Sequence, residues 1–363
     1  MVATGIGTGS IFGNNGNPIV KLANVTTRAL NDTNRNYVPD CDLINPDANG
    51  ECGVMANRSF GHPTSGTVYD PDTMTGWGKR PFNWEFSAGV QYLLFQRVSL
   101  NVGYFDRWYG NQVVTDNRAV TAADFDRFSI PAPGDARLPG GGYTIGNLYN
   151  LQPAKVGLVD PYLTFSKNFG RDSERWRGTD ISVDTRFRNI LLQGGVSAGR
   201  TSTDNCELRE KLPEIAPVNP YCNVSEKLQT QVKFIGSYTI PRVDVQTSAA
   251  FQSFPGPAVV ADFVATNPVI QPSLGRPLSG GALNVPVNLI ETGSLFGERT
   301  TQLDLRFAKL LRFGRSRSTV SLDVYNAFNA NAVLQEATAY GRYREPVQIL
   351  QARFARISLQ FDF

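Results

Sequence analysis

The last eight residues of the chain alternate strictly between polar and apolar side chains. The apolar positions are Ile357, Leu359, Phe361 and Phe363, and the polar positions between them are Arg356, Ser358, Gln360 and Asp362. Successive side chains of a β-strand point to opposite faces, so this period of two predicts a strand with one apolar and one polar face. The final residue of this run is itself an aromatic, which suits a strand that faces lipid better than one that faces water.

The same alternation recurs along most of the sequence. It is clear at 82–94, 98–104, 180–187, 232–240, 303–307 and 320–324, and weaker at 17–25, 142–152, 156–167, 191–202 and 243–254. These runs predict roughly twelve strands. Several are longer than the five or six residues that are usual in soluble sheets, and they match the roughly nine to eleven residues of a tilted membrane strand.

The connections between these runs alternate in length. Tight links are expected at 96–97, 153–154, 188–189, 241–242 and 314–317, and long Pro/Gly-rich segments lie at 119–141, 203–227, 255–298 and 330–352. Outer-membrane barrels have short periplasmic turns and long extracellular loops. We therefore predict an all-β fold, an antiparallel transmembrane β-barrel portion with long extracellular loops and a periplasmic C-terminus. The alternative is a secreted β-sandwich or β-solenoid, whose strands would be shorter and whose loops would not alternate in length.

Composition and cysteine spacing restrict the class of protein and the cell compartment in which it folds. The formal net charge of +3 gives no basic footprint for nucleic acid, and no run of 18 apolar residues is present that would form a transmembrane helix. Cys41 lies near Cys52, and Cys206 lies near Cys222, each pair within one polar segment. Two local disulfides in an oxidising compartment are the simplest interpretation, and free thiols are the alternative.

Catalytic chemistry has little support in the sequence. His62 is the single histidine and lies in a Gly-His-Pro loop, so no nucleophile–His–acid arrangement can be built without it. We therefore expect that the chain is not an enzyme.

One segment has the spacing of a loop for a hard cation. Its oxygen-bearing side chains are Asp32, Asn34, Asn36, Asp40 and Asp42. Calcium takes six to eight oxygen ligands from loops of this kind, although Tyr37 and Leu43 replace the glycine and glutamate of the usual calcium loop. A structural calcium site is one interpretation, and a plain polar loop held by the Cys41–Cys52 bridge is the other.

The polar positions of the predicted strands carry charges of both signs. They are Asp180, Asp184, Arg186, Lys233, Asp304, Arg306 and Asp323. We expect these side chains to face the lumen, where they would solvate the inner wall and hold a plug. Lining a substrate path is the alternative role, which the mixed signs favour less.

Several stretches resemble a known family. They are Asn83–Gln91, Val102–Gly110, Thr301–Arg306, Ser321–Asn329 and Leu359–Phe363, of which the Asp-Val-Tyr-Asn-Ala-Phe-Asn run at 323–329 is the most specific. The chain resembles the C-terminal half of a TonB-dependent outer-membrane receptor, most closely the subgroup with a carboxypeptidase-regulatory-like N-terminal domain. The resemblance implies a barrel of about 22 strands around a plug. About twelve strands are expected here, with residues 1–81 forming a strand and an extracellular loop and residues 82–363 forming about eleven barrel strands.

The resemblance also implies a function and partners. The start of the sequence has neither the basic nor the apolar region of a signal peptide. The signal peptide, the plug and the early strands are therefore expected elsewhere. Either this sequence is a fragment of a longer gene product that contains them, or it is a truncated reading frame that has lost them. The implied function is TonB-driven uptake of a large scarce solute, a siderophore, oligosaccharide or peptide. Implied partners are outer-membrane lipid, the plug and missing strands, TonB, and the barrel-assembly machinery, which would read the terminal strand. The alternative is a passive barrel or an adhesion protein that presents disulfide-braced loops.

Overall fold

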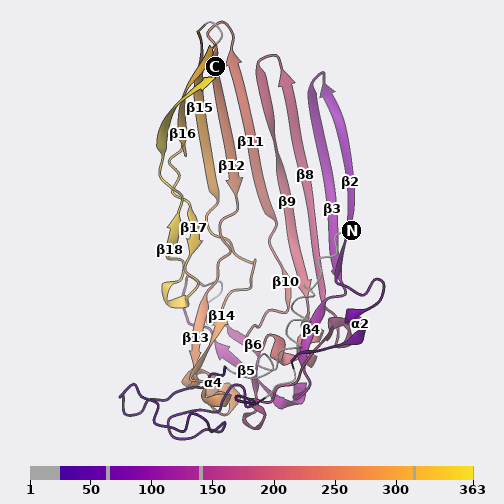
Figure 1. Ribbon diagram of the computed structural model, residues 1–363, viewed down its shortest axis with the longest axis vertical. Coiled ribbons are helices and arrows are strands. Elements are labelled where there is room, and N and C mark those ends of the chain that lie inside the picture. Colours follow the sequence, from indigo (N-terminus) through magenta and orange to yellow (C-terminus); the bar gives the residue numbers. More distant parts are fainter. Residues whose placement is uncertain (1–24, 63–65, 139–141, 314–315, 363) are drawn as a thin grey trace.

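The computed structural model describes residues 25–62, 66–138, 142–313 and 316–362. Its dominant feature is a wall of long antiparallel strands, closed at one end by a layer of shorter elements (Figure 1). The strand predicted at 17–25 lies almost wholly outside the described residues. Among the described residues, no helix is long and apolar enough to cross a membrane.

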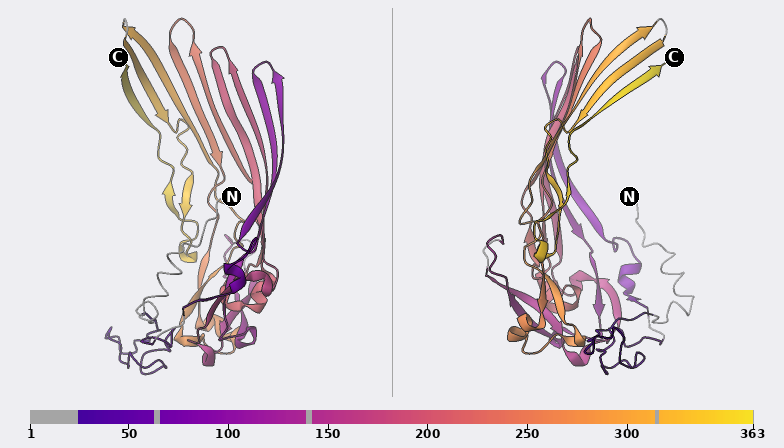
Figure 2. Two further views of the ribbon diagram at one scale, coloured as in Figure 1. Left: turned by 45° about the vertical axis from the view of Figure 1, so that its right-hand side comes forward. Right: turned by 90° about the vertical axis from the view of Figure 1, so that its left-hand side faces the viewer.

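Nine strands form the wall, in the order in which they occur in the sequence. They are β2 (Phe82–Phe95), β3 (Val98–Gly110), β8 (Ser173–Phe187), β9 (Ile190–Asp204), β11 (Gln229–Ile240), β12 (Val245–Phe254), β15 (Thr300–Phe313), β16 (Ser316–Tyr325) and β19 (Phe354–Asp362). Each strand pairs antiparallel with the next, so the wall is a simple meander. The short strand β10 (Asn223–Ser225) pairs antiparallel with the last residues of β9, from Ser202 to Asp204. Figure 2 shows that the wall twists, so that its C-terminal strands lean away from its N-terminal strands.

The length of the connections alternates as the sequence predicts. Two-residue links join β2 to β3 and β8 to β9, and a short link joins β11 to β12; Arg97, Arg188 and Arg242 adopt positive φ in these turns. All the tight turns lie at one end of the wall together with the C-terminus, and all the long connections lie at the other end (Figure 1). The predicted tight link at 153–154 is wrong, because Pro153–Lys155 forms a 3-10 helix (η2) at the end with the long connections.

The long connections fold into a layer that we call the cap, made of residues 111–172, 205–228, 255–299 and 326–353. Its strands are β4 (Val113–Asn117), β5 (Phe125–Pro131), β6 (Thr144–Leu151), β7 (Pro161–Phe165), β13 (Asp262–Thr266), β14 (Asn284–Asn288), β17 (Val333–Glu336) and β18 (Pro346–Ile349), and its helices are α3 (Cys206–Lys211) and α4 (Asn267–Leu274). Five further 3-10 helices complete it: η1 (Ala122–Asp124), η3 (Ser166–Asn168), η4 (Pro213–Ile215), η5 (Ser279–Gly281) and η6 (Tyr340–Arg342).

Two of the predicted wall strands belong to the cap instead. The segments 142–152 and 156–167 contain β6 and β7, which pair with β5 and with β4 and not with the wall. Their eight and five residues are shorter than the roughly nine to eleven that a tilted membrane strand needs. The described wall therefore has nine strands where the sequence suggested about eleven between residues 82 and 363.

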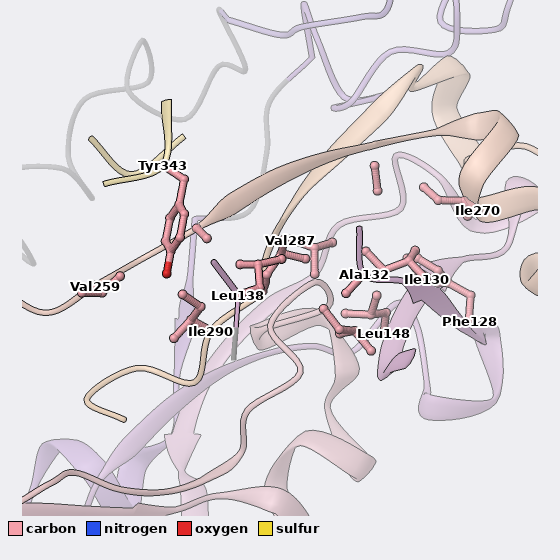
Figure 3. Packing of buried hydrophobic residues seen from close by; sticks show 14 of the residues in the cluster. Phe128, Ile130, Ala132, Leu138, Leu148, Val259, Ile270, Val287, Ile290 and Tyr343 are labelled. Carbon is pink, nitrogen blue, oxygen red and sulfur yellow. The ribbon is translucent and has the colours of Figure 1, made fainter. Parts of the chain in front are cut away.

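The cap has a hydrophobic core of its own (Figure 3). It combines residues of β5 and β6, such as Ile130 and Leu148, with residues of α4 and β14, such as Ile270 and Val287, all 0% exposed. Full burial of a side chain of this size stabilises the folded state by about 1.5–3 kcal/mol relative to leaving it exposed. Every member of this core lies in the cap, so the cap is a packed layer rather than a set of free loops.

Residues 25–81 run along the cap. The disulfide between Cys41 and Cys52 closes the first part, and Arg28 donates to the carbonyl oxygens of Asn45, Asp47 and Gly53 at 3.1, 2.9 and 2.8 Å. Further on, the two-residue strand β1 (Val68–Tyr69) pairs in parallel with β7 and leads into helix α2 (Pro71–Met74). The first contacts brace residues 28–53 internally, and the pairing of β1 with β7 fixes the later part of the segment to the cap before the chain enters the wall.

Candidate functional site: the polar face of the wall and the cap

The strand registers divide the wall into two faces. Directly opposed residues point to the same side of a sheet, so the pairs Ile181–Val102 and Ile181–Val196 belong to one face, and Asp180–Ser197 belongs to the other. Followed from strand to strand, these registers define an apolar face and a polar face. The apolar face carries exposed large side chains in every region of the wall, among them Trp84, Phe86, Val90, Val102, Ile181, Val196, Phe307, Leu322, Ile357, Leu359 and Phe361.

All seven charged residues expected to face a lumen share the polar face. Asp180 and Asp184 oppose Ser197 and Gln193, Lys233 opposes Gln252, and Arg306 opposes Asp323. Arg186 lies two residues beyond Asp184 in β8, and Asp304 lies two residues before Arg306 in β15, so alternation brings both to the same side. The structure therefore brings these residues onto one surface, although they come from four strands, β8, β11, β15 and β16.

The part of this surface on β8, β9 and β11 is hollowed and hydrogen-bonded. Ser197 Oγ donates to Asp180 Oδ1, and Gln193 Nε2 donates to Asp184 Oδ2. Asp180, Ser197 and Lys233 border a shallow pocket of about 290 Å³. Gly195 also borders it, and a Cβ atom at this position would collide with the carbonyl oxygen of Ile181 in the neighbouring strand β8. The close approach of β8 to β9 therefore requires glycine at this position.

The part on β15, β16 and β19 is built around one carboxylate. Asp323 is 5% exposed and accepts from Arg306 Nε at 2.9 Å and from Arg356 Nη2 at 3.0 Å. Beside it, Gln302 Nε2 donates to Asp304 Oδ1 at 2.9 Å. Asp323 is thus paired with arginines of both neighbouring strands, and Gln302 and Asp304 are paired within β15, so the polar groups of this surface satisfy one another.

The cap covers the end of the wall, and one arginine links two of its segments (Figure 1). Arg276 Nη2 lies 2.6 Å from Asp126 Oδ2, its Nη1 donates to Asn150 Oδ1 at 2.7 Å, and it also donates to Ser279 Oγ at 2.8 Å. Arg276 follows α4, whereas Asp126 lies in β5 and Asn150 in β6. Its side chain is 21% exposed. The contact therefore ties together two cap segments that are far apart in the sequence.

Titratable groups in the cap are shifted in both directions. The guanidinium of Arg137, with the hydroxyl of Tyr340 as a further donor, holds the pKa of Asp135 well below its usual value. Burial raises the pKa of Glu214, whose Oε1 accepts from the Asn117 amide at 3.3 Å. Burial likewise raises the pKa of the Tyr221 phenol.

The expected disulfides are confirmed, and they lie near the cap end of the wall. Cys41 bonds Cys52, and Cys206 bonds Cys222. The second bridge links the start of α3 to the residue before β10, where the Asn205 amide also donates to the Cys222 carbonyl at 2.9 Å. It therefore braces the connection between β9 and β11.

The proposed calcium loop is satisfied by its own hydrogen bonds. Asp32 accepts from the amides of Asn36 and Tyr37 at 3.2 and 2.9 Å, and Asn36 Nδ2 donates to Asp40 Oδ2 at 3.0 Å. Asn34 Nδ2 also donates to Asp40, and Asp42 accepts from the Ile44 amide at 2.9 Å. Among the described residues, no group of three His, Cys, Asp or Glu is placed to hold a metal ion. The plain polar loop accounts for these contacts, and calcium binding stays a prediction.

The terminal strand and the lone histidine complete the predicted positions. Ile357, Leu359 and Phe361 lie on the apolar face of β19, and are 78%, 55% and 62% exposed; Phe363 lies outside the described residues. His62 is exposed in a loop, where its amide donates to the Ser59 carbonyl at 2.8 Å.

The structure gives the motif at 323–329 a role that sequence reasoning missed. Asn326 is 2% exposed, adopts positive φ, and donates through Nδ2 to the carbonyls of Ala330 and Gln351, each at 2.8 Å. Asn329 accepts from the Arg353 amide at 3.0 Å. The two asparagines thus fix both ends of the connection between β16 and β19, and their tolerance of positive φ was the available signal.

Comparisons with known proteins give a likeness of structure only. No protein-family model and no curated protein matches the chain. Among solved structures, it is similar to the outer membrane transporter YddB from Escherichia coli, at 12% identity and a TM-score of 0.40, over 83% of this chain and 34% of that one. It is also similar to the ferric-catecholate import receptor Fiu from E. coli K12, at 14% identity and a TM-score of 0.39, over 79% of this chain and 30% of that one. The chain spans about a third of the length of these structures.

Proposed function

We propose that the chain forms part of the barrel wall and the extracellular cap of an outer-membrane transporter of the TonB-dependent receptor type. The observation that carries this proposal is the nine-stranded meander with one exposed apolar face, one polar face, and all of its long connections at one end. The motifs at 83–91 and 323–329 supply the resemblance to that family.

Lipid is the solvent that suits the apolar face. Trp84, Phe86 and Ile357 are 62%, 56% and 78% exposed, although large contiguous apolar patches are rare on soluble proteins. The buried apolar cluster of the described chain is in the cap, so no second layer within that part covers the wall. A barrel placed in a bilayer would present this face to acyl chains.

The edges of the wall call for further strands. In the described part of the chain, β2 pairs only with β3, and β19 pairs only with β16. Unpaired backbone groups cannot face hydrocarbon, so both edges must be paired in the membrane. We propose that strands of the same transporter outside this chain close the barrel, and that its plug packs on the polar face near Asp180, Lys233 and Asp323.

The cap is the proposed first contact with the solute. It is pre-folded, disulfide-braced, and sits where an extracellular layer would lie if the tight turns face the periplasm. The proposed solute is large and scarce, of the siderophore, oligosaccharide or peptide class, and its uptake would be driven through TonB. The barrel-assembly machinery would read the apolar residues of β19.

A pair of substitutions on adjacent residues tests the membrane placement. Ile357→Lys puts a charge on the apolar face, whereas Ser358→Lys puts it on the polar face one residue away. A lysine facing the bilayer midplane costs about 2–4 kcal/mol. We expect Ile357→Lys to lower the yield of heat-modifiable protein in outer membranes and Ser358→Lys to leave it near that of the unaltered protein. Equal yields of the two variants would contradict the placement.

Labelling of intact cells tests the orientation. A cysteine introduced by Arg342→Cys in the cap should react with a membrane-impermeant maleimide, and one introduced by Asn189→Cys in a tight turn should not. Both residues are exposed in the structure, so access to the reagent and not burial decides the result. Labelling at position 189 and not at position 342 would show that the tight turns, and not the cap, face the outside of the cell.

Uptake measurements separate the transporter from its alternatives. Cells that express the full gene product would be offered ferric chelates, oligosaccharides and peptides, with and without a protonophore. A TonB-driven transporter accumulates one of these classes only while the proton gradient is intact. Uptake of small solutes that the protonophore does not affect would identify a passive barrel. Surface binding without any uptake would identify an adhesion protein, the alternative that the two disulfides near the cap favour.

A further inference from the structure

The apolar face changes character toward the cap. Along β8 and β9, the pair Ile181–Val196 is followed by Thr179–Ala198, and then by Arg177–Arg200. Ile181 and Arg177 are four residue steps apart along the extended strand, a distance of about 13 Å. The face is therefore apolar over the middle of the wall and basic at its cap end.

Aromatic residues mark the level of this transition. Trp84 opposes Trp108, and Trp108 opposes Arg175, so the three side chains form one row across β2, β3 and β8. Trp84 and Trp108 are 62% and 41% exposed. Tryptophan is enriched where a membrane meets water, which places the arginines at the boundary between hydrocarbon and headgroups.

The basic cluster carries more positive than negative charge. Arg175 Nε donates to Asp106 Oδ1 at 2.7 Å, and Arg177 Nε lies 3.6 Å from Asp106 Oδ2, so two arginines share one carboxylate. Arg171 lies 3.5 Å from Asp204. No carboxylate in the described part of the chain lies within ion-pair distance of Arg200. Two negative charges thus face four positive ones.

The arrangement of these arginines makes the excess positive charge destabilising when no anion is bound. Arg177 and Arg200 are direct cross-strand partners, and like charges in that relation destabilise a sheet. The four arginines border an open pocket of about 750 Å³. Glu174 also borders it, but its register partner Thr203 places it on the polar-face side of the sheet. A bound anion would relieve the repulsion between Arg177 and Arg200.

We propose that Arg175, Arg177 and Arg200 bind the phosphate of an anionic lipid headgroup in the leaflet on the cap side of the membrane. Guanidinium groups match phosphate oxygens with paired hydrogen bonds, and they are favoured over lysine where such recognition matters. A lipid suits the site better than free phosphate, because its acyl chains would lie along the apolar face below, beside Val102 and Ile181. This inference rests on the proposed membrane placement.

Native mass spectrometry of the protein in nonionic detergent micelles tests the site. The probes are phosphatidic acid, phosphatidylcholine and inorganic phosphate. We expect phosphatidic acid to be retained at least about tenfold more strongly than phosphatidylcholine, and the double change Arg177→Gln with Arg200→Gln to remove most of that preference. Arg242→Gln, an exposed arginine in a tight turn at the other end of the wall, is the matched control and should change nothing.

Thermal unfolding provides a second measurement. Arg200→Gln removes the like-charge contact, so the lipid-free variant should melt no lower than the unaltered protein while losing the upward shift given by phosphatidic acid. Equal retention of both lipids, or an undiminished preference in the double variant, would overturn the inference. Binding of inorganic phosphate as tight as that of phosphatidic acid would reduce the site to a free-anion site. Failure of the Ile357→Lys comparison would instead overturn the membrane placement itself.

Discussion

Replacing Arg276 by methionine should loosen the cap and leave the wall folded. The substitution keeps an unbranched side chain but removes the ion pair to Asp126 and the hydrogen bonds to Asn150 and Ser279. Breaking a fully buried pair by removing one partner costs about 3–5 kcal/mol. The side chains of Arg276 and Asp126 are 21% and 39% exposed, so water can replace part of the lost contacts. We therefore expect a loss of about 2 kcal/mol in the stability of the cap.

That loss corresponds to an increase of about 25-fold in the fraction of opened cap, at 1.4 kcal/mol for each factor of ten. Hydrogen exchange measured by mass spectrometry in micelles would report it as faster exchange in peptides from 125–151 and 262–290. Peptides from β9 serve as an internal reference, because the wall does not contact Arg276 through any described hydrogen bond.

The matched control is Arg342→Met. Arg342 also pairs with a carboxylate in the cap, but its side chain and that of Glu345 are 66% and 53% exposed, and exposed pairs contribute about 0–1 kcal/mol. Its exchange pattern should stay close to that of the unaltered protein. Unchanged protection of 125–151 in Arg276→Met, or equal loss of protection in the cap and in β9, would refute the role assigned to this arginine.

Three further changes probe other parts of the structure. Asp323→Ala leaves two half-exposed arginines without their carboxylate and should lower stability by about 1–2 kcal/mol, seen as a lower temperature for the heat-induced gel shift; Asp323→Asn should lose less. Cys206→Ser combined with Cys222→Ser opens a bridge with a sequence separation of 16 and should cost about 3 kcal/mol, measured as faster proteolysis within 205–228 that reductant reproduces in the unaltered protein. The pKa of Asp135 is lowered from 3.8, so its stabilising contribution is full above that pH and is lost as the pH falls below it. Exchange in the cap, corrected for its intrinsic rate, should therefore accelerate below about pH 4, and Asp135→Asn should reduce that dependence.

The wall could be predicted from the sequence because its physical cause is local. A strand between lipid and a wet interior must alternate, and the runs around Trp84, Ile181 and Leu322 show that alternation directly. The same period of two predicted that the seven charged residues share one face of the wall. The two disulfides followed from the short spacing of their cysteines.

The cap could not be predicted in the same way because its causes are distant in the sequence. Ile130 and Val287 pack in one core although more than a hundred residues separate them. Arg276 meets Asp126 across 150 residues, and no local pattern marks either residue. Alternation alone also misassigned 142–152, since a hairpin packed on a core shows the same period as a membrane strand.

The separate core of the cap has an evolutionary consequence. The buried cluster that includes Leu148 and Ile270 draws no member from the nine strands of the wall. Under the proposed function, substitutions that reshape the cap are thereby decoupled from those that keep the wall in a bilayer. A transporter built in this way would change the solute that its cap recognises, or escape an antibody or phage that binds the cap, while the strands of its wall stay the same.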